Sequence, residues 1–150
     1  MNYNKTLNSP LEVALRALII LSTNTNKFYS IEKLAYLDQI ITHMKDYGLM
    51  EQNLHNKSIF LESELITKQI LLKRGLLYLV SKDLVQVIIK DSKIYYKSNK
   101  FSDLFLNTFT SIYYDDYKLF ANIVIKKFGK THTNLLKNVV LENIYLKGVE

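Results

Sequence analysis

The sequence predicts a mainly α-helical protein with one small β-hairpin, an α+β fold. Apolar residues recur at helical spacing over most of the chain, and the spacing changes once, to every second residue, between Val85 and Tyr96. Four glycines and one proline are too few for a loop-rich β-sandwich. A chain of 150 residues that is 48% hydrophobic can fill a core, and its length is typical of one compact domain with at most a helical extension.

The first predicted helix begins at Ser9 and Pro10. Ser9 can cap the free amides, Pro10 suits the first helical position, and Glu12 completes a capping box. The polar run 22–26 ends the helix. Its buried face is predicted from the spacing of Leu11, Ala14, Leu15, Leu18 and Leu21.

Two more helices are expected before residue 80. Ser30 caps the second, and Gly48 is its predicted C-terminal stop. The third runs from near Leu61 towards Leu79. The buried stripe of the second helix consists of Leu34, Leu37, Ile41 and Met44, and the basic residues of the third are Lys68, Lys73 and Arg74.

The alternating residues after Asp83 predict a β-hairpin with a turn at Asp91 and Ser92. Three helices followed by a hairpin is the layout of a winged-helix domain. We therefore expect a winged-helix-like core over residues 1–99, with the third helix in the place of the recognition helix and residues 85–97 as the wing. This likeness concerns architecture and does not define a function.

The rest of the chain, residues 100–150, is predicted to be a C-terminal helical extension packed on that core. Apolar and aromatic residues keep helical spacing from Phe101 to Phe128, with a small phase shift at 113–116, and Gly129 ends the run. A final helix is expected from Leu135 to Ile144. This stripe is best explained as core, although aromatic residues are also enriched at protein interfaces.

The formal net charge of +6 is concentrated in two lysine patches, one around the hairpin and one at 126–137. Basic clusters can follow a phosphate backbone or an acidic protein face, and solvated surface lysines are an equally good explanation. If DNA is bound, the candidate contacts are Lys90, Lys93 and Lys97 on the wing with Lys73 and Arg74 on the third helix.

Known catalytic patterns are missing. The sequence has no cysteine, no phosphate-binding glycine motif and no H-E-x-x-H, and His43, His55 and His132 have no metal-ligand spacing. We therefore expect no enzyme, no cofactor and no metal. Residues 1–9 do not resemble a signal peptide, and the apolar run Ala17–Leu21 is too short to span a bilayer, so a cytoplasmic protein is expected.

The segment 34–65 carries polar residues that an amphipathic helix does not require. Asp38, His43 and Asp46 are predicted on one helix, with His55 in the loop that follows. We expect them to form a polar network that shapes the loop 49–60 for partner binding. Glu62 and Glu64 open the next helix, where the helix dipole favours carboxylates.

This segment also carries a family resemblance. Ser9-Pro10-Leu11-Glu12, Leu15-Arg16, Leu34-x-Tyr36-Leu37-Asp38, His43, Asp46-Tyr47-Gly48, Leu54-His55 and Glu64-Leu65 resemble the middle component of bacterial ABC-three-component defence systems, which are related to Lamassu. Members of such families often have a proline after the loop histidine and an arginine early in the third helix. This chain has Asn56 and Lys68 at those places.

The resemblance implies a non-enzymatic subunit that assembles with an SMC-like ABC ATPase and an effector, often a nuclease, against phages or plasmids. It implies that the subunit bridges these two partners and meets DNA, if at all, through the complex. The alternative is a free-standing winged-helix transcription regulator. Such a regulator needs base-reading side chains on its recognition helix, whereas Gln69 and Arg74 stand among many leucines and isoleucines.

Overall fold

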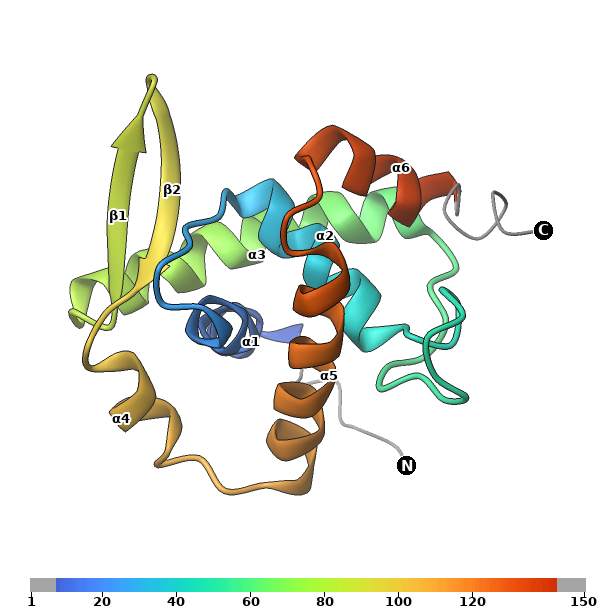
Figure 1. Cartoon of the computed structure of the whole chain (residues 1–150), viewed down its shortest axis with the longest axis horizontal. Coiled ribbons are helices and arrows are strands. Elements are labelled where there is room, and N and C mark those ends of the chain that lie inside the picture. Colours follow the sequence, from blue (N-terminus) through green and yellow to red (C-terminus); the bar gives the residue numbers. More distant parts are fainter. Residues whose placement is uncertain (1–7, 143–150) are drawn as a thin grey trace.

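The computed structural model describes residues 8–142, and it confirms a mainly helical protein with one antiparallel hairpin (Figure 1). None of the described helices combines the length and the apolar character needed to cross a membrane. In chain order the elements are α1 (Pro10–Thr23), α2 (Ile31–Thr42), α3 (Leu61–Ser81), β1 (Val85–Lys90), β2 (Lys93–Ser98), α4 (Ser102–Leu106), α5 (Ile112–Phe128) and α6 (Thr133–Glu142).

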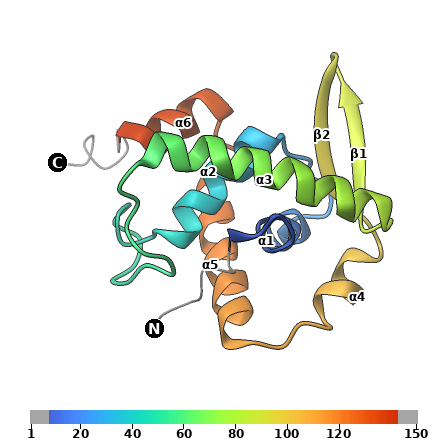
Figure 2. The same cartoon turned by 180° about the vertical axis from the view of Figure 1, so that it is seen from behind.

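The predicted start of α1 is confirmed, and its contact with α3 depends on a glycine. The Ser9 side chain accepts a hydrogen bond from the Glu12 amide, and Pro10 is the first helical residue. Figure 2 shows α3 crossing close to α1. A Cβ atom on Gly75 would lie 2.1 Å from the Pro10 carbonyl oxygen and 2.5 Å from the Ala14 Cβ. Gly75 therefore allows the two backbones to approach closely.

Helix α2 begins as predicted at the Ser30 cap but ends earlier than predicted. Its last residue is Thr42, and the His43 amide donates to the carbonyls of the final turn. Gly48, at φ 72°, closes the turns that follow and is not the stop of the helix. The prediction that Asp38, His43 and Asp46 share one helix is therefore wrong. His43 caps α2 in a non-helical conformation (φ −131°, ψ 42°), which ends the helix before Asp46.

The hairpin is confirmed, including its turn. Asp91 and Ser92 both have positive φ (52° and 62°), as a tight two-residue hairpin turn requires. The pairing of Val85 with Ser98 and of Lys90 with Lys93 sets the register. Because strand side chains alternate between faces, this register places Lys90, Lys93 and Lys97 on one face and Val87, Ile89 and Ile94 on the other. The hairpin rises beside the C-terminal end of α3 (Figures 1 and 2).

The prediction of a continuous helical region from Phe101 to Phe128 is wrong. Helix α4 has only five residues, and α5 starts at Ile112. The interruption comes from Ser111, which is extended (φ −154°, ψ 153°) and accepts a hydrogen bond from the Tyr114 amide as the cap of α5. Gly129 ends α5 as predicted. Helix α6 is present, whereas Ile144 lies outside the described residues.

One hydrophobic core joins the early and late helices. It includes Leu18 of α1, Leu37 of α2, Leu76 of α3, Val124 of α5 and Leu136 of α6, all fully buried. Helix α5 packs against both α1 and α2. The C-terminal helices therefore pack on α1 and α2, whereas the winged-helix likeness of residues 1–99 stays a prediction.

Candidate functional site: a buried charged network and the loop it holds

The Asp38 carboxylate is the centre of a network that joins four helices. Arg16 of α1 binds it with two nitrogens, Nε at 2.9 Å from Oδ1 and a terminal nitrogen at 3.2 Å from Oδ2. Lys68 of α3 places Nζ 2.8 Å from Oδ2, and the Tyr117 hydroxyl of α5 donates to Oδ1 at 2.6 Å. All four residues are buried. Helices α1, α3 and α5 thus each contribute one side chain that binds the carboxylate of α2.

The network is strongly polarised because two cations surround one carboxylate. Burial alone would raise the pKa of Asp38, but Arg16 and Lys68 outweigh it and hold that pKa well below its usual range. Burial, followed by the charge of Asp38, raises the pKa of Tyr117. Asp38 is therefore ionised and Tyr117 is neutral at neutral pH. Removing one partner of such a group leaves an uncompensated buried charge, which is costly.

Gln39 extends the network from Lys68 to the loop 49–60. Its Oε1 accepts from Lys68 Nζ at 2.9 Å, and its Nε2 donates to the Ser58 hydroxyl at 3.0 Å and lies 3.2 Å from His43 Nδ1. His43 Nε2 lies 2.8 Å from the Asn56 carbonyl oxygen, which can only accept. The short bond to this carbonyl favours the proton of His43 on Nε2, whereas Nδ1 lies 2.8 Å from the Thr42 hydroxyl, 3.1 Å from the Gln39 carbonyl oxygen and 3.2 Å from the Gln39 amide nitrogen. Burial lowers the pKa of His43, against the opposing effect of the Asn56 bond.

His55 connects the loop to Arg16 through a tyrosine. Its Nε2 lies 2.7 Å from the Tyr113 hydroxyl, and Arg16 also hydrogen-bonds that hydroxyl. Because the guanidinium can only donate, the Tyr113 proton is available to His55 Nε2, and the ring proton of His55 belongs on Nδ1. Burial, and then the charge of Arg16, lowers the pKa of His55 to about 3. His55 is a neutral acceptor at neutral pH.

The loop 49–60 is attached to the end of α2 by several bonds. The His55 amide donates to the Thr42 carbonyl at 3.0 Å, in addition to the bonds to Asn56 and Ser58. Asn53 donates to the Asp46 carboxylate at 3.1 Å and accepts from the Lys45 amide. These hydrogen bonds attach the loop to the end of α2. Asp38 binds side chains of other helices and does not bind the loop, whereas Asp46 contacts the loop through Asn53. Whether the loop binds a partner stays a prediction.

Five members of the network were not identified from the sequence as site residues: Arg16, Gln39, Lys68, Tyr113 and Tyr117. One signal was available for Arg16. Arg16 is the only charged residue in the apolar run Val13–Leu21, and a charge inside a run that is apolar on all sides has to meet an opposite charge when the helix is buried. The tyrosines gave no such signal, since they continue the aromatic stripe of α5.

Four of the five predicted DNA contacts are exposed, and the five residues lie on the hairpin and on α3. Lys90 and Lys93 are at the end of the hairpin, and Lys97 is half-buried on the same face. Tyr95, also on that face, contacts the Phe28 ring edge-on with centroids 5.1 Å apart, and Lys90 Nζ lies 5.8 Å from the Phe28 centroid. Lys73 and Arg74 are exposed on α3.

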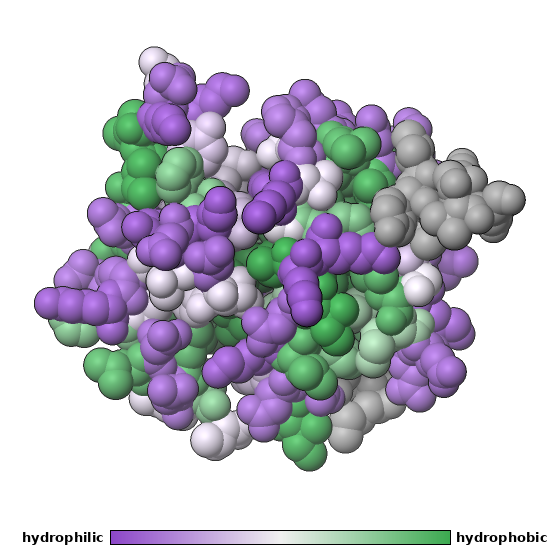
Figure 3. Space-filling view, in the orientation of Figure 1, coloured by the Kyte–Doolittle hydropathy of each residue, from purple (hydrophilic) through white to green (hydrophobic). Residues whose placement is uncertain are grey.

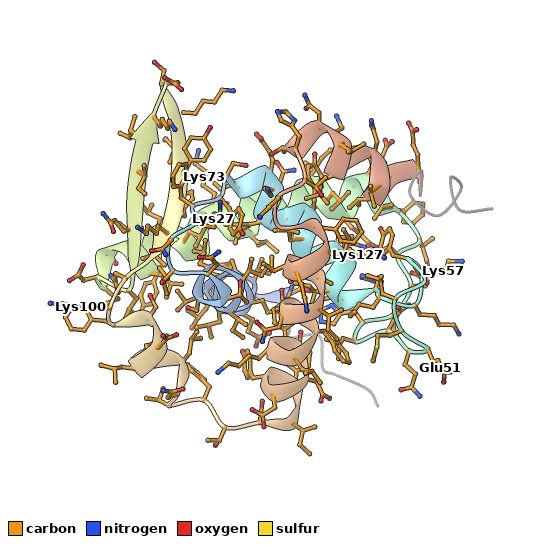
Figure 4. All side chains as sticks on the ribbon, viewed as in Figure 1. Lys27, Glu51, Lys57, Lys73, Lys100 and Lys127 are labelled. Atoms are coloured by element: carbon orange, nitrogen blue, oxygen red, sulfur yellow. The ribbon has the colours of Figure 1, made fainter. Side chains whose placement is uncertain are left out.

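The figures show how these charges are distributed. Lys73 and Lys100 lie towards the hairpin side of the molecule, whereas Lys57 and Glu51 lie on the loop at the opposite end (Figure 4). In Figure 3 hydrophilic residues gather at the tip of the hairpin, and hydrophobic residues lie below them along the side of β1.

A cavity of about 360 Å³ lies between α1, α4 and α5. Its lining mixes apolar rings, such as Phe109 and Tyr114, with polar and charged groups, such as Asp103, Asp115 and Lys118. Within the described residues, no group of three His, Cys, Asp or Glu side chains could hold a metal ion.

These features define a small helical domain in which the notable charged residues bind one another in the core. Over residues 6–148 the chain matches the family described as ABC-three component (ABC-3C) system Middle Component 2, and it belongs to this family. It is accordingly an accessory component of a defence system that contains an ABC ATPase, as the resemblance implied. No curated protein and no solved structure matches the chain.

Proposed function

We propose that this chain is a non-catalytic assembly subunit that holds the ABC ATPase and the effector of its system together. The observation that carries the proposal is the position of the polar residues on which the family resemblance rests. Arg16, Asp38 and His43 are buried and engaged with other side chains or with the backbone. Their common role is to fix four helices and one loop in a defined arrangement.

The state of the two histidines supports a structural role. A general base works best with a pKa near the working pH and with access to the proton it removes. His43 is buried and donates to a backbone carbonyl, and the pKa of His55 is lowered to about 3. Neither group matches the requirements of acid–base catalysis at neutral pH.

The surface supports a role in binding other proteins. Five large apolar side chains at the end of the loop and on α3 are more than half exposed: Ile59 (82% exposed), Phe60 (72%), Ile66 (63%), Ile70 (51%) and Leu77 (69%). Others lie on the hairpin, α4, α5 and α6. Contiguous exposed apolar patches on soluble proteins mark interaction sites more often than chance. An exposed α3 face of this kind is also poorly suited to reading base edges, which favours the subunit over the free-standing regulator.

Co-expression tests the assembly role directly. The chain, the ABC ATPase and the effector encoded beside it should elute together in size-exclusion chromatography at micromolar concentration. Omitting this chain should separate the ATPase from the effector. Separate elution of the chain from both partners would contradict the proposal.

The loop offers a second, sharper test. His55→Ala removes the bond to Tyr113, so the loop 49–60 should loosen and assembly should weaken. Catalytic activity of the complex should fall only in proportion to assembly. A His55→Ala variant that assembles fully while all catalytic activity is lost would mean that this chain takes part in the chemistry.

We also propose that the lysine face of the hairpin contacts DNA within the complex. Lys90, Lys93 and Lys97 share that face, so one phosphate backbone could meet all three. Changing them to Glu should weaken binding equally for different DNA sequences and reduce the salt dependence by at most about three units of slope. The matched control changes the exposed Lys126, Lys130 and Lys137 to Glu. Equal effects of both triple changes would show that only total charge matters.

A further inference from the structure

The hairpin has one strand edge that no described residue covers. On its outer side β2 pairs with Tyr29, which exchanges two backbone hydrogen bonds with Tyr96. Strand β1 has no such neighbour among residues 8–142. Figures 1 and 2 show β1 on the outer side of the hairpin and β2 towards the helices. The outer edge of β1 is therefore open.

The strand pairing shows which backbone groups point to this open edge. Because Tyr96 directs its amide and carbonyl towards Tyr29, it forms a non-hydrogen-bonded pair with Val87. The amide and carbonyl of Val87 therefore point away from β2, and those of Ile89 do the same two residues later. No group of the described chain bonds to them. An extended chain laid along β1 would pair with both residues, as a strand added to a sheet edge does.

Strand β1 lacks the features by which sheet edges usually avoid other strands. It contains no proline, its pairing with β2 runs without a bulge, and its only charged residue is the last one, Lys90. The side chains beside the open backbone groups are apolar, with Val87 40% exposed and Ile89 73%. Ile94 lies opposite Ile89 on the same face and is 55% exposed. The edge therefore offers both backbone bonds and an apolar face to an added strand.

The other face of the hairpin indicates which charges an added strand should carry. It holds Lys90, Lys93 and Lys97, and no described residue forms an ion pair with any of them. A second copy of β1 fits poorly, because the two-fold axis of an antiparallel strand pair is perpendicular to the sheet and keeps the lysines of both copies on one face. A strand with acidic side chains on that face would instead offset their charge.

We propose that the outer edge of β1 binds an extended segment of another protein, in which apolar and acidic side chains alternate. The apolar side chains lie on the face of Val87, Ile89 and Ile94, and the acidic ones lie on the lysine face. Backbone hydrogen bonds to Val87 and Ile89 hold the segment as a third strand. This inference does not depend on the bridging role. If both hold, the ABC ATPase or the effector supplies the segment.

Amide hydrogen exchange tests the edge at the residues concerned. In the free chain the Val87 and Ile89 amides should exchange faster than those of Ile88 and Lys90, which point towards β2. The probe is a synthetic peptide of about six residues in which valine alternates with glutamate. At a peptide concentration of about 1 mM, exchange at Val87 and Ile89 should slow at least several-fold. Unchanged exchange at both residues would overturn the proposal.

Matched peptides test the chemistry assigned to the segment. Lysine in place of glutamate keeps the alternation but places like charges beside Lys90, so this peptide should bind at least about tenfold more weakly. A peptide with proline at its central valine cannot form the full ladder and should also bind weakly. Fluorescence anisotropy of labelled peptides measures the affinities. Equal binding of the glutamate and lysine peptides would overturn the acidic assignment.

A proline at residue 89 tests whether the backbone makes the contact. Ile89→Pro removes an amide that points outward, so the hydrogen bonds between β1 and β2 remain, and thermal unfolding checks the fold. The matched control Ile89→Thr keeps the amide and a β-branched side chain. Ile89→Pro should abolish peptide binding, whereas Ile89→Thr should weaken it less. Equal losses would mean that only the side chain is contacted, which would overturn strand addition.

Further outcomes separate this inference from the proposed function. If the peptide binds but the chain never co-elutes with the ABC ATPase or the effector, the strand site stands and the proposed function falls. If the complex forms equally well with Ile89→Pro and the peptide does not bind, the strand site falls and the proposed function stands. A chain that self-associates, and becomes monomeric in Ile89→Pro, would place a second copy on the edge and overturn the assignment to another protein.

Discussion

At the scale of single residues, Asp38 has the largest structural role in the described chain. It accepts bonds from Arg16, Lys68 and Tyr117, which come from three other helices. A buried carboxylate between two buried cations stabilises a fold only when every member is present. The network therefore favours the one arrangement of the helices in which all of these bonds form, because any other arrangement leaves a buried charge without its partner.

Asp38→Asn should destabilise the protein strongly. The change leaves Arg16 and Lys68 buried without a carboxylate, and breaking a buried pair in this way costs about 3–5 kcal/mol. Urea unfolding followed by circular dichroism measures the loss. Asp46→Asn is the control, since Asp46 is only half-buried, and it should cost less than about 1 kcal/mol. Equal losses in the two variants would show that the network contributes little.

The neutral histidines predict a stability that falls in mild acid. The pKa of His55 is about 3 in the folded chain against an ordinary value of 6.5, and that of His43 is also lowered. Below pH 6.5 the unfolded chain therefore binds more protons than the folded one, so stability falls as the pH drops from about 6.5 towards about 3. Above pH 6.5 this contribution is fully present.

Urea midpoints at several pH values between 7 and 4 measure this effect. In His55→Gln the decline should be shallower, because one of the two groups no longer titrates. A decline equally steep in the variant would mean that other groups, such as the carboxylates, control the acid sensitivity.

At the scale of elements, α1 and α3 cross in close contact, and the residue of α3 at the crossing is Gly75. Gly75 faces the Pro10 carbonyl at a distance that leaves no space for a methyl group. The close packing of α3 against α1 therefore requires a residue without a Cβ atom at position 75.

Gly75→Ala should destabilise the protein, although alanine is the better helix former. Overpacking at this crossing should cost about 1–3 kcal/mol, since backbone atoms of α1 have to move. Thermal unfolding measures the change. Ser81→Ala at the exposed end of the same helix is the comparison and should be near neutral. An unchanged or raised melting temperature in Gly75→Ala would contradict the close packing.

At the scale of the whole molecule, the C-terminal helices complete the core. Tyr117 and Val124 of α5 are fully buried, and the Tyr47 hydroxyl of the segment after α2 donates to the Val140 carbonyl of α6. Residues 1–99 alone would expose this surface and leave Asp38 without the Tyr117 bond. The described helices therefore depend on each other for burial.

A fragment of residues 1–99 should fail to form a stable fold. Its amide spectrum should show little dispersion, and ANS should bind to the exposed apolar surface. A second fragment, residues 1–142, keeps every described helix and should fold like the full chain. A well-dispersed spectrum for residues 1–99 would show that the first three helices and the hairpin are an independent domain.

The sequence by itself determined the features that depend on neighbouring residues. The caps at Ser9 and Ser30, the hairpin turn at Asp91 and the end of α5 at Gly129 follow from local chemistry. The family pattern could also be read from residue order. The exceptions were the early end of α2, where His43 leaves the helical conformation, and the break before Ile112, where the extended Ser111 caps α5. Periodicity alone would continue both patterns.

Only the tertiary structure decided what the polar residues do. Asp38 meets Arg16 from 22 residues before it and Tyr117 from 79 residues after it, and His55 meets Tyr113 at a separation of 58 residues. Periodicity can place a residue on a helix face, but it cannot say which distant helix that face meets. The partners of a buried charge are set by how the helices pack. The network at Asp38 therefore became visible only when α1, α2, α3 and α5 came together.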